Sequence, residues 1–374
     1  MSATVAVTSS STTRRRVLAL VEARSLSGPL RQTITLASEL RSQGTELCIG
    51  LPTPVDTMVL DHATALGVGV VSFAWPDLGP PWRQVRTLLS RFGADLLQTH
   101  SYKPDILAAL GRASVAVPWL MVHHGVTAEN RIVRMYHGLD RQAARFANGI
   151  VCVADAQRRR FKGLGVPIWT IPNALLQPGA HGGVTALNES LDRGPVLWCI
   201  GRLSFEKGVD RAIGLLAELR GRGMWVRMGI VGDGPERKRL EMLVEQIGVR
   251  DAVTWYGHRD EPWAYVASHD VLLLPSRSEG MPNVLFEAVQ CGVRYAAAGV
   301  GDVPIIHAAA PGAGVILDPE AGESTWANAV AALIAAPHAA ATARRARESL
   351  ANAFSPARRA SRFSDVYDSL QGLR

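Results

Sequence analysis

Two series of short apolar runs, separated by longer amphipathic segments, most strongly constrain what this 374-residue chain can fold into. The short runs have the length and composition of buried strands, and the segments between them have the periodicity of helices. Strands that alternate with helices form a parallel sheet covered on both faces, so each series predicts a doubly wound, Rossmann-like α/β domain. The predicted strands are 17–22, 46–51, 68–73, 95–99, 119–123, 150–154 and 168–171 in the first series, and 196–200, 225–231, 252–256, 271–275, 294–298 and 314–317 in the second.

The segments outside the two series set the expected domain boundaries. Residues 1–13 are rich in Ser, Thr and Ala without an apolar period, which predicts a disordered tail. The stretch 173–194 has the Gly- and Pro-rich composition of an interdomain connection, so we expect domains over 14–180 and 181–355. The last segment, 356–374, predicts a helix that packs back on the N-terminal domain through one apolar face. That face consists of Phe363, Val366, Tyr367 and Leu370.

Composition excludes several classes of protein. Hydrophobic residues make up 47% of the chain and charged residues 20%, as in globular proteins. No apolar run approaches the roughly 20 residues of a membrane-spanning helix. The four cysteines are scattered, with no His at metal-ligand spacing, so we expect neither a metal site nor a disulfide framework. The apolar run after Arg16 is interrupted at Glu22, which argues against a signal peptide and favours a cytoplasmic protein.

Positive charge is concentrated in the first half of the chain. The net charge is +7, and residues 1–180 contain 19 Lys and Arg against 11 Asp and Glu. Within this half, 131–146 mixes helix-spaced arginines with apolar residues, which is typical either of a solvated helix face or of a segment that touches an anionic membrane. No basic helix with an interleaved aromatic platform is found, so nucleic acid is not an expected partner.

The segment 276–292 carries the strongest chemical signal. It follows a predicted buried strand, Pro282 suits the first position of a helix, and Gly292 suits the position after its end. We therefore predict a helix over 282–291, whose first backbone amides and dipole form an anion site. The amides concerned are those of Asn283, Val284 and Leu285.

Two glutamates flank the start of this predicted helix. Glu279 and Glu287 have seven residues between them, and a carboxylate can accept hydrogen bonds from sugar hydroxyls. An isolated glutamate is most often a solvated surface residue. The Gly, Pro and Asn residues between the two favour a binding role here.

A second signal lies in 201–208, directly after another predicted strand. Arg202 and Lys207 are cations near a predicted helix N-terminus, where the dipole disfavours positive charge unless an anion binds. A diphosphate fits two such cations together with helix amides. The alternative is that Lys207 forms a salt bridge to Glu206 or Asp210.

Two weaker signals lie in the N-terminal domain. Gly28 follows the first predicted strand, where a glycine-containing loop faces a ligand about as often as it forms a plain turn. His123 and His124 end the fifth predicted strand and, because side chains alternate along a strand, cannot both face the same way. We favour His124, next to Gly125, as the one in a site, although a structural role is commoner for any lone histidine.

Together these motifs resemble the retaining family 4 glycosyltransferases of the GT-B fold. The resemblance is strongest over 195–318 and rests on the segments SEGMPNVLFEA, GRLSFEKG, IVGDGPER and VTWYGH, together with the later FSPARRASRFSDVYDSL. It implies two tandem Rossmann-like domains with an interdomain cleft. The N-terminal domain would bind a hydroxyl acceptor, and the C-terminal domain a nucleotide-diphosphate sugar.

The resemblance also implies a role for each matching residue. Arg202 and Lys207 would neutralise the donor diphosphate, Glu279 would hold the hydroxyls of the donor sugar, and Glu287 would bind the ribose. His124 would lie where donor and acceptor meet. We therefore expect His124, Arg202, Lys207 and Glu279 to be catalytic. The donor-binding residues would be Gly28, Gly201, Arg202, Lys207, Gly280, Met281, Asn283, Val284 and Glu287.

In the similar enzymes the nucleotide diphosphate leaves and the acceptor hydroxyl attacks on the same face, so no protein nucleophile is required. Fixed cations and amides would stabilise the charge on the leaving group. The chain has no Asp-x-Asp pair, and we expect no metal ion or other cofactor. The expected acceptor is a saccharide or a lipid-linked intermediate of cell-surface polysaccharide synthesis, reached by peripheral contact with the inner face of the membrane.

The chain departs from the family pattern at two places. Segment 301–305 reads GDVPI where the family often has Gly-Gly-x-Pro-Glu, and 153–155 reads VAD where the strand usually ends in Ser. Neither departure involves the residues expected to bind the diphosphate, so they bear on the choice of donor sugar and on acceptor contacts. Two alternative functions on the same fold also stay open. One is a nucleotide-sugar epimerase or hydrolase, and the other is a non-catalytic protein that binds sugar nucleotides.

Overall fold

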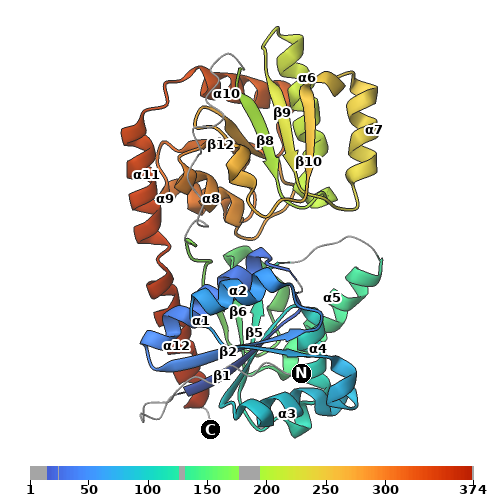
Figure 1. Ribbon diagram of the computed structural model, residues 1–374, viewed down its shortest axis with the longest axis vertical. Helices are drawn as coiled ribbons and strands as arrows, with labels where there is room; N and C mark the ends of the chain where they lie inside the picture. Colours follow the sequence, from blue (N-terminus) through green and yellow to red (C-terminus); the bar gives the residue numbers. More distant parts are fainter. Residues whose placement is uncertain (1–14, 24, 126–130, 177–193, 373–374) are drawn as a thin grey trace. The chain divides into compact units, whose positions relative to one another are not determined.

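The computed structural model describes residues 15–23, 25–125, 131–176 and 194–372 (Figure 1). The predicted tail 1–13 and most of the predicted connection 173–194 lie outside the described residues. The chain divides into two compact units. Unit 1 comprises Met1–Leu176 and Phe354–Arg374, and unit 2 comprises Gln177–Ala353.

Unit 1 is built on a seven-stranded parallel sheet in the order β3-β2-β1-β4-β5-β6-β7. The chain passes outward from β1 to β3 and then returns to place β4 on the other side of β1. This reversal is a topological switch point, where the carboxyl ends of two neighbouring strands open to a ligand. The strands are β1 (Arg15–Val21), β2 (Thr45–Pro52), β3 (Val70–Phe73), β4 (Leu96–His100), β5 (Trp119–His123), β6 (Gly149–Cys152) and β7 (Ile168–Thr170).

Helices cover both faces of this sheet because successive side chains of its strands point to opposite sides. Val17 and Ala19 of β1 belong to a core shared with α1 (Gly28–Ser42) and α12 (Pro356–Gln371), whereas Leu18 and Leu20 belong to the core on the other face. Figure 1 shows α12 beside α1, although the two helices lie at opposite ends of the sequence. The predicted apolar face of the last helix is buried in this core: Phe363, Val366, Tyr367 and Leu370. The other helices of unit 1 are α2 (Thr57–Ala65), α3 (Pro81–Phe92), α4 (Tyr102–Leu110) and α5 (Arg131–Ala143).

Unit 2 repeats the plan with a six-stranded parallel sheet in the order β10-β9-β8-β11-β12-β13. Its switch point lies between β8 and β11. The strands are β8 (Val196–Ile200), β9 (Arg227–Val231), β10 (Val253–Gly257), β11 (Val271–Leu274), β12 (Arg294–Ala298) and β13 (Gly314–Leu317). The helices are α6 (Val209–Gly221), α7 (Arg237–Ile247), α8 (Asn283–Cys291), α9 (Val303–Ala309), α10 (Glu323–Ala335) and α11 (Ala340–Ala353).

The predicted doubly wound α/β architecture is confirmed in both units. Strand ends differ from the sequence expectations by a few residues. The strand expected over 225–231 begins at Arg227, because the amide of Val226 bonds the carbonyl of Met224 in a local turn. Within the described residues, no helix is both long enough and apolar enough to cross a bilayer.

Candidate functional site

The switch point of unit 2 brings two of the predicted motifs to one edge of the sheet. Segment 201–208 follows β8, and segment 275–282 follows β11, its parallel neighbour. Because the carboxyl ends of neighbouring parallel strands lie at the same edge, the two loops meet there. A small pocket at this edge is lined by residues of both loops, among them Gly201, Arg202, Leu203, Lys207 and Pro275.

Lys207 and Glu279 form an ion pair at this edge. The Nζ atom of Lys207 lies 2.7 Å from Oε1 of Glu279, and the hydroxyl of Ser276 donates to the same oxygen over 2.7 Å. The side chain of Glu279 is 7% exposed, whereas that of Lys207 is 30% exposed. Lys207 therefore pairs with Glu279, and not with Glu206 or Asp210 as in the alternative considered from the sequence. An ammonium group has three donors, so an anion at this edge can share Lys207 with Glu279.

Gly208 allows the loop that carries Lys207 to approach the loop that carries Glu279. Lys207 ends a short 3-10 turn, Phe205–Lys207, and Gly208 follows with a φ of 65°. A Cβ atom at position 208 would lie 2.3 Å from the carbonyl oxygen of Pro275. Only glycine fits here, for both the left-handed backbone and the close contact. The position of Lys207 is thus coupled to the backbone that carries Glu279.

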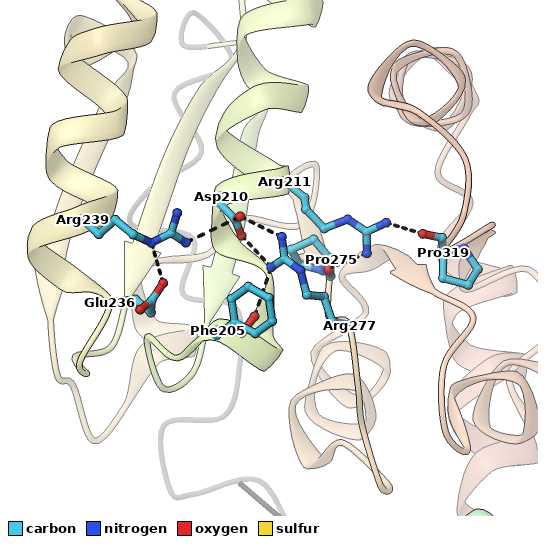
Figure 2. Close-up of polar contacts among 8 residues, drawn as sticks. All are labelled: Phe205, Asp210, Arg211, Glu236, Arg239, Pro275, Arg277 and Pro319. Carbon is cyan, nitrogen blue, oxygen red and sulfur yellow. Dashed lines mark hydrogen bonds and ion pairs between the residues drawn. The ribbon is translucent and has the colours of Figure 1, made fainter. Parts of the chain in front are cut away.

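A network around Asp210 joins the same two loops (Figure 2). Arg277 donates two hydrogen bonds to the carboxylate of Asp210, over 2.8 and 2.7 Å, and a third over 3.0 Å to the carbonyl oxygen of Phe205. Its guanidinium also lies 4.3 Å from the centre of the Phe205 ring. Arg239 of α7 lies 3.5 Å from the same carboxylate. Sequence reasoning considered Asp210 only as a possible partner of Lys207 and missed its contacts with Arg277 and Arg239, which connect the start of α6 with the loop after β11 and with α7.

Arg277 changes the ionisation of Asp210. Burial acts to raise the pKa of this carboxyl group, but the hydrogen bonds and charge of Arg277, with the charge of Arg239, outweigh burial and hold the pKa below its usual value of 3.8. Because the pKa is lower in the folded state than in the unfolded state, ionised Asp210 stabilises the fold at neutral pH. That contribution is lost as the pH falls through the folded-state pKa.

We therefore expect Asp210→Asn to lower the free energy of unfolding at pH 7 by about 1.5–3 kcal/mol, the usual size for hydrogen bonds to a charged group. The difference from the wild type should shrink as the pH falls from about 5 to about 3, because protonation of the wild-type carboxylate removes the same interaction. Urea unfolding at several pH values measures it. Asp260→Asn, at an exposed aspartate of the same unit, is the control. A difference that stays constant over this range would contradict the assignment.

Helix α8 begins one residue later than predicted and has fewer available amides. Pro282 precedes the helix in an extended conformation, and Asn283 and Val284 are its first two residues. The amide of Leu285 bonds the carbonyl of Pro282 over 3.2 Å, so the prediction that its amide is available to an anion is wrong. Asn283 and Val284 remain the predicted anion-binding positions at this N-terminus.

Segment 301–305, which departs from the family pattern, lies directly against the loop that carries Glu279. The amide of Asp302 donates to the carbonyl of Gly280 over 2.9 Å, and a Cβ atom at Gly301 would lie 2.2 Å from the carbonyl oxygen of Glu279. The side chain of Met281, the next residue of that loop, is buried. The segment in which this chain differs from the family pattern therefore adjoins the residues that we expect to bind the sugar.

Glu287 lies in the middle of α8 and is held by a residue that the sequence did not single out. The indole Nε1 of Trp263 donates to Oε2 of Glu287 over 2.9 Å. Trp263 belongs to the short turn Pro262–Tyr265, which follows β10 at the same edge of the sheet. The position of Trp263 shortly after a strand end is the sequence signal that could have identified it as a site residue.

In unit 1, the two predicted site residues also follow strand ends. Gly28 is the first residue of α1, after β1, and His124 follows β5. Nε2 of His124 lies 2.8 Å from Nδ1 of His100, and the two rings are stacked. His123 instead packs edge-on against Phe161. Burial lowers the pKa of His124, and the charges of His100 and Arg359 lower it further, so the ring is neutral at pH 7.

The candidate residues thus fall into two groups. Gly28 and His124 belong to unit 1, and the remaining ones gather at the switch-point edge of unit 2. The described parts of both units hold no group of three or more His, Cys, Asp or Glu side chains placed to bind a metal ion.

Solved structures share this fold at low sequence identity. The structure of HepE from Anabaena in complex with UDP-glucose superposes with a TM-score of 0.77 at 20% identity, over 95% of this chain and 99% of that one. Sucrose-phosphate synthase from Thermosynechococcus elongatus superposes with a TM-score of 0.75 at 19% identity, over 96% of this chain and 100% of that one.

Curated relatives match over shorter stretches. A 2-deoxystreptamine glucosyltransferase of Streptomyces kanamyceticus is 38% identical over 110 residues, which are 29% of this chain and 28% of the relative. WcaL of Salmonella typhimurium, a putative colanic acid biosynthesis glycosyltransferase, is 28% identical over 256 residues, which are 63% of this chain and 58% of the relative. Both matches span less than two thirds of the relative's length.

Family models match each part of the chain in turn. Residues 27–175 match the model of Glycosyltransferase Family 4, and residues 188–349 match that of Glycosyl transferases group 1. The two parallel sheets and their switch points agree with these matches. The protein belongs to the GT-B glycosyltransferases, with a Family 4 domain followed by a group 1 domain.

Proposed function

We propose that this protein transfers a sugar from a nucleotide-diphosphate sugar to a hydroxyl acceptor, with retention of the anomeric configuration. The observation that carries the proposal is the Lys207–Glu279 ion pair beside Arg202 at the edge between β8 and β11. Two cations at one pocket fit a diphosphate, and an adjacent carboxylate fits sugar hydroxyls. The HepE structures with UDP and UDP-glucose make a uridine diphosphate sugar the first donor to test.

In the proposed reaction, the bond between the anomeric carbon and the diphosphate oxygen breaks while the acceptor oxygen bonds to the same face of the sugar. The acceptor's proton passes to the departing phosphate oxygen, so that the charges balance. Arg202, Lys207 and the first amides of α8 stabilise the negative charge on the leaving group. The two cations do the work that a bound metal ion does elsewhere, so we propose that no metal ion or other cofactor is required.

We propose a saccharide or lipid-linked acceptor of cell-surface polysaccharide synthesis. This proposal is supported by relatives named for colanic acid and lipopolysaccharide synthesis. Such an acceptor places the enzyme in the cytoplasm, at the inner face of the membrane.

The test incubates the purified protein with UDP-glucose, UDP-N-acetylglucosamine or GDP-mannose, with and without a panel of glycan and lipid-linked acceptors. We expect the release of nucleoside diphosphate to require an acceptor, and NMR of the product to show the anomeric configuration of the donor. Release without an acceptor would identify a hydrolase, and a changed donor sugar would identify an epimerase. Binding without any turnover would identify a sugar-nucleotide binding protein.

One surface of unit 1 supports the proposed membrane contact. Met135 and Leu139 lie one turn apart in α5 and are 57% and 46% exposed, and Phe146, shortly after the helix, is 56% exposed. Arg145 is exposed beside Phe146, and Arg112 donates to the carbonyl oxygen of Phe146 over 3.1 Å. Exposed apolar side chains flanked by arginines suit an anionic lipid surface.

We expect the triple variant Met135→Ser, Leu139→Ser, Phe146→Ser to bind vesicles of phosphatidylcholine and phosphatidylglycerol at least about ten-fold more weakly than the wild type. Each buried apolar side chain contributes about 1.5–3 kcal/mol, and 1.4 kcal/mol is a factor of ten. Vesicle flotation measures the bound fraction. The control is Met242→Ser with Ile247→Ser, two exposed apolar residues of α7 in unit 2. Equal binding by the wild type and the triple variant would overturn the membrane contact.

A further inference from the structure

A chain of hydrogen bonds crosses the interior of unit 1 and ends at His124. The hydroxyl of Tyr367 in α12 donates to Oε1 of Gln98 over 2.7 Å, and Nε2 of Gln98 lies 2.8 Å from Nε2 of His100. Nδ1 of His100 then lies 2.8 Å from Nε2 of His124. We call these four residues the relay. It brings residues from α12 and β4 to the histidine that follows β5.

The amide nitrogen of Gln98 sets the direction of the hydrogen bonds that follow it in the relay. An amide nitrogen can only donate, so Nε2 of His100 accepts from Gln98 and carries no proton. Neutral His100 must then carry its proton on Nδ1, which donates to Nε2 of His124. Neutral His124 is consequently protonated on Nδ1. These proton positions are assigned from the hydrogen-bond pattern.

The relay is buried, so its hydrogen bonds are hard to replace. Tyr367, Gln98 and His100 are each 0% exposed, and polar groups inside a protein are costly unless they are paired. Burial, and then the charge of Arg359, lower the pKa of His100 to about 3, so its ring stays neutral at physiological pH. One protonation pattern is therefore fixed over the neutral range.

The backbone beside the relay is also unusual. Ser101, the residue after His100, has a φ of 79°, a conformation that non-glycine residues rarely adopt. Among the described residues it is the only non-glycine position with a positive φ. Such positions concentrate at functional sites, where the surrounding structure maintains the strain. The relay therefore leads to a part of unit 1 that is unusual in both its backbone and its buried polar groups.

We propose that Tyr367 and Gln98 are positioning residues that act through His100 to hold His124 as the Nδ1–H tautomer. The C-terminal helix is then part of the functional apparatus of unit 1 as well as of its core. The relay leaves Nδ1–H as the polar group of the imidazole that is available to a ligand. The inference rests on the proposed function only for the use of that proton, which His124 would donate to an oxygen of the donor sugar or of the acceptor.

Histidine tautomers are directly measurable, and this gives a test independent of activity. In two-bond ¹H–¹⁵N spectra of the full-length protein, we expect Nδ1 of His100 and His124 to resonate as protonated nitrogens and Nε2 as unprotonated ones. Gln98→Glu should reverse both tautomers, because a carboxylate accepts from Tyr367 and from a proton on Nε2 of His100. An unprotonated Nδ1 on His124 in the wild type would overturn the proposal.

A second variant covers the case in which Gln98→Glu does not fold. Tyr367→Phe removes only the hydroxyl that orients the Gln98 amide, so we expect mixed tautomers at His124 and a kcat lowered about 10- to 100-fold, with little change in the KM for the donor. Tyr295→Phe is the matched control, since the hydroxyl of Tyr295 contacts Nδ1 of His307 over 2.9 Å in unit 2. Tyr367→Phe with the tautomers and kcat of the control would overturn the proposal. Changed tautomers with unchanged kcat would support the relay and contradict the role proposed for His124.

Discussion

Replacing Lys207 with alanine is expected to lower kcat/KM for sugar transfer by about 10²- to 10³-fold, the usual effect of removing one fixed group that stabilises charge in a transition state. Lys207 is 30% exposed and reaches the pocket edge from a turn whose backbone packs against the loop after β11. Its charge is therefore fixed where the diphosphate charge would develop. Because this charge would meet the proposed diphosphate both before and after bond cleavage, the affinity for nucleoside diphosphate should fall as well.

The matched control for this prediction is Lys238→Ala. Lys238 is an exposed lysine of α7 in the same unit, so the change removes the same charge away from the pocket. Initial rates at several donor concentrations give kcat and KM for each variant. Wild-type kinetics in Lys207→Ala would remove Lys207 from the site, whereas an equal loss in both variants would indicate a general effect of charge.

Replacing Glu279 with glutamine is expected to lower kcat/KM about 10²-fold. Unlike the change at Lys207, it should affect the binding of UDP and of UDP-glucose in different ways. Oε1 of Glu279 accepts from Lys207 and from Ser276, and the side chain is almost fully buried. Glutamine keeps the shape but weakens the hydrogen bonds proposed to hold the sugar hydroxyls. It also frees Lys207 from a competing negative charge. Affinity for UDP should therefore stay the same or rise, while affinity for UDP-glucose falls.

Calorimetric titration with UDP and with UDP-glucose separates these two effects. Glu245→Gln is the control, because Glu245 is an exposed glutamate that pairs with Arg250 at the end of α7. A parallel loss of affinity for both ligands would mean that Glu279 supports the diphosphate site. If Glu279→Gln kept the wild-type ratio of the affinities for UDP and UDP-glucose, and the wild-type rate, the role of Glu279 in holding the sugar would be contradicted.

Hydrophobic periodicity was enough to predict the fold, because both sheets are covered on two faces and most of their strand residues are apolar. It could not give exact ends, since these depend on single hydrogen bonds. The strand predicted over 150–154 begins at Gly149 and ends at Cys152. Pro282 precedes its helix because its backbone is extended there.

The loops of the candidate site were predictable for a topological reason. Segments that directly follow strands gather at one edge of a parallel sheet, so Lys207 and Glu279 could be assigned to one site although they are 72 residues apart. Side-chain partnerships had no such signal. Arg277 and Asp210 are ordinary charged residues, and Tyr367 was only one member of an apolar face. Their contacts, across 67 and 269 residues, depend on how the helices pack.

The central claim is that the switch-point edge of unit 2 binds a nucleoside diphosphate through Lys207. The most direct measurement is the thermal unfolding midpoint of the wild type and of Lys207→Ala, with and without a panel of nucleoside diphosphates. A ligand at about 100 times its dissociation constant adds about 2.7 kcal/mol, which raises the midpoint by about 5–10 °C for a domain of this size. We predict such a rise with one nucleotide in the wild type and its loss in Lys207→Ala. No rise with any nucleotide, or an equal rise in both proteins, would contradict the claim.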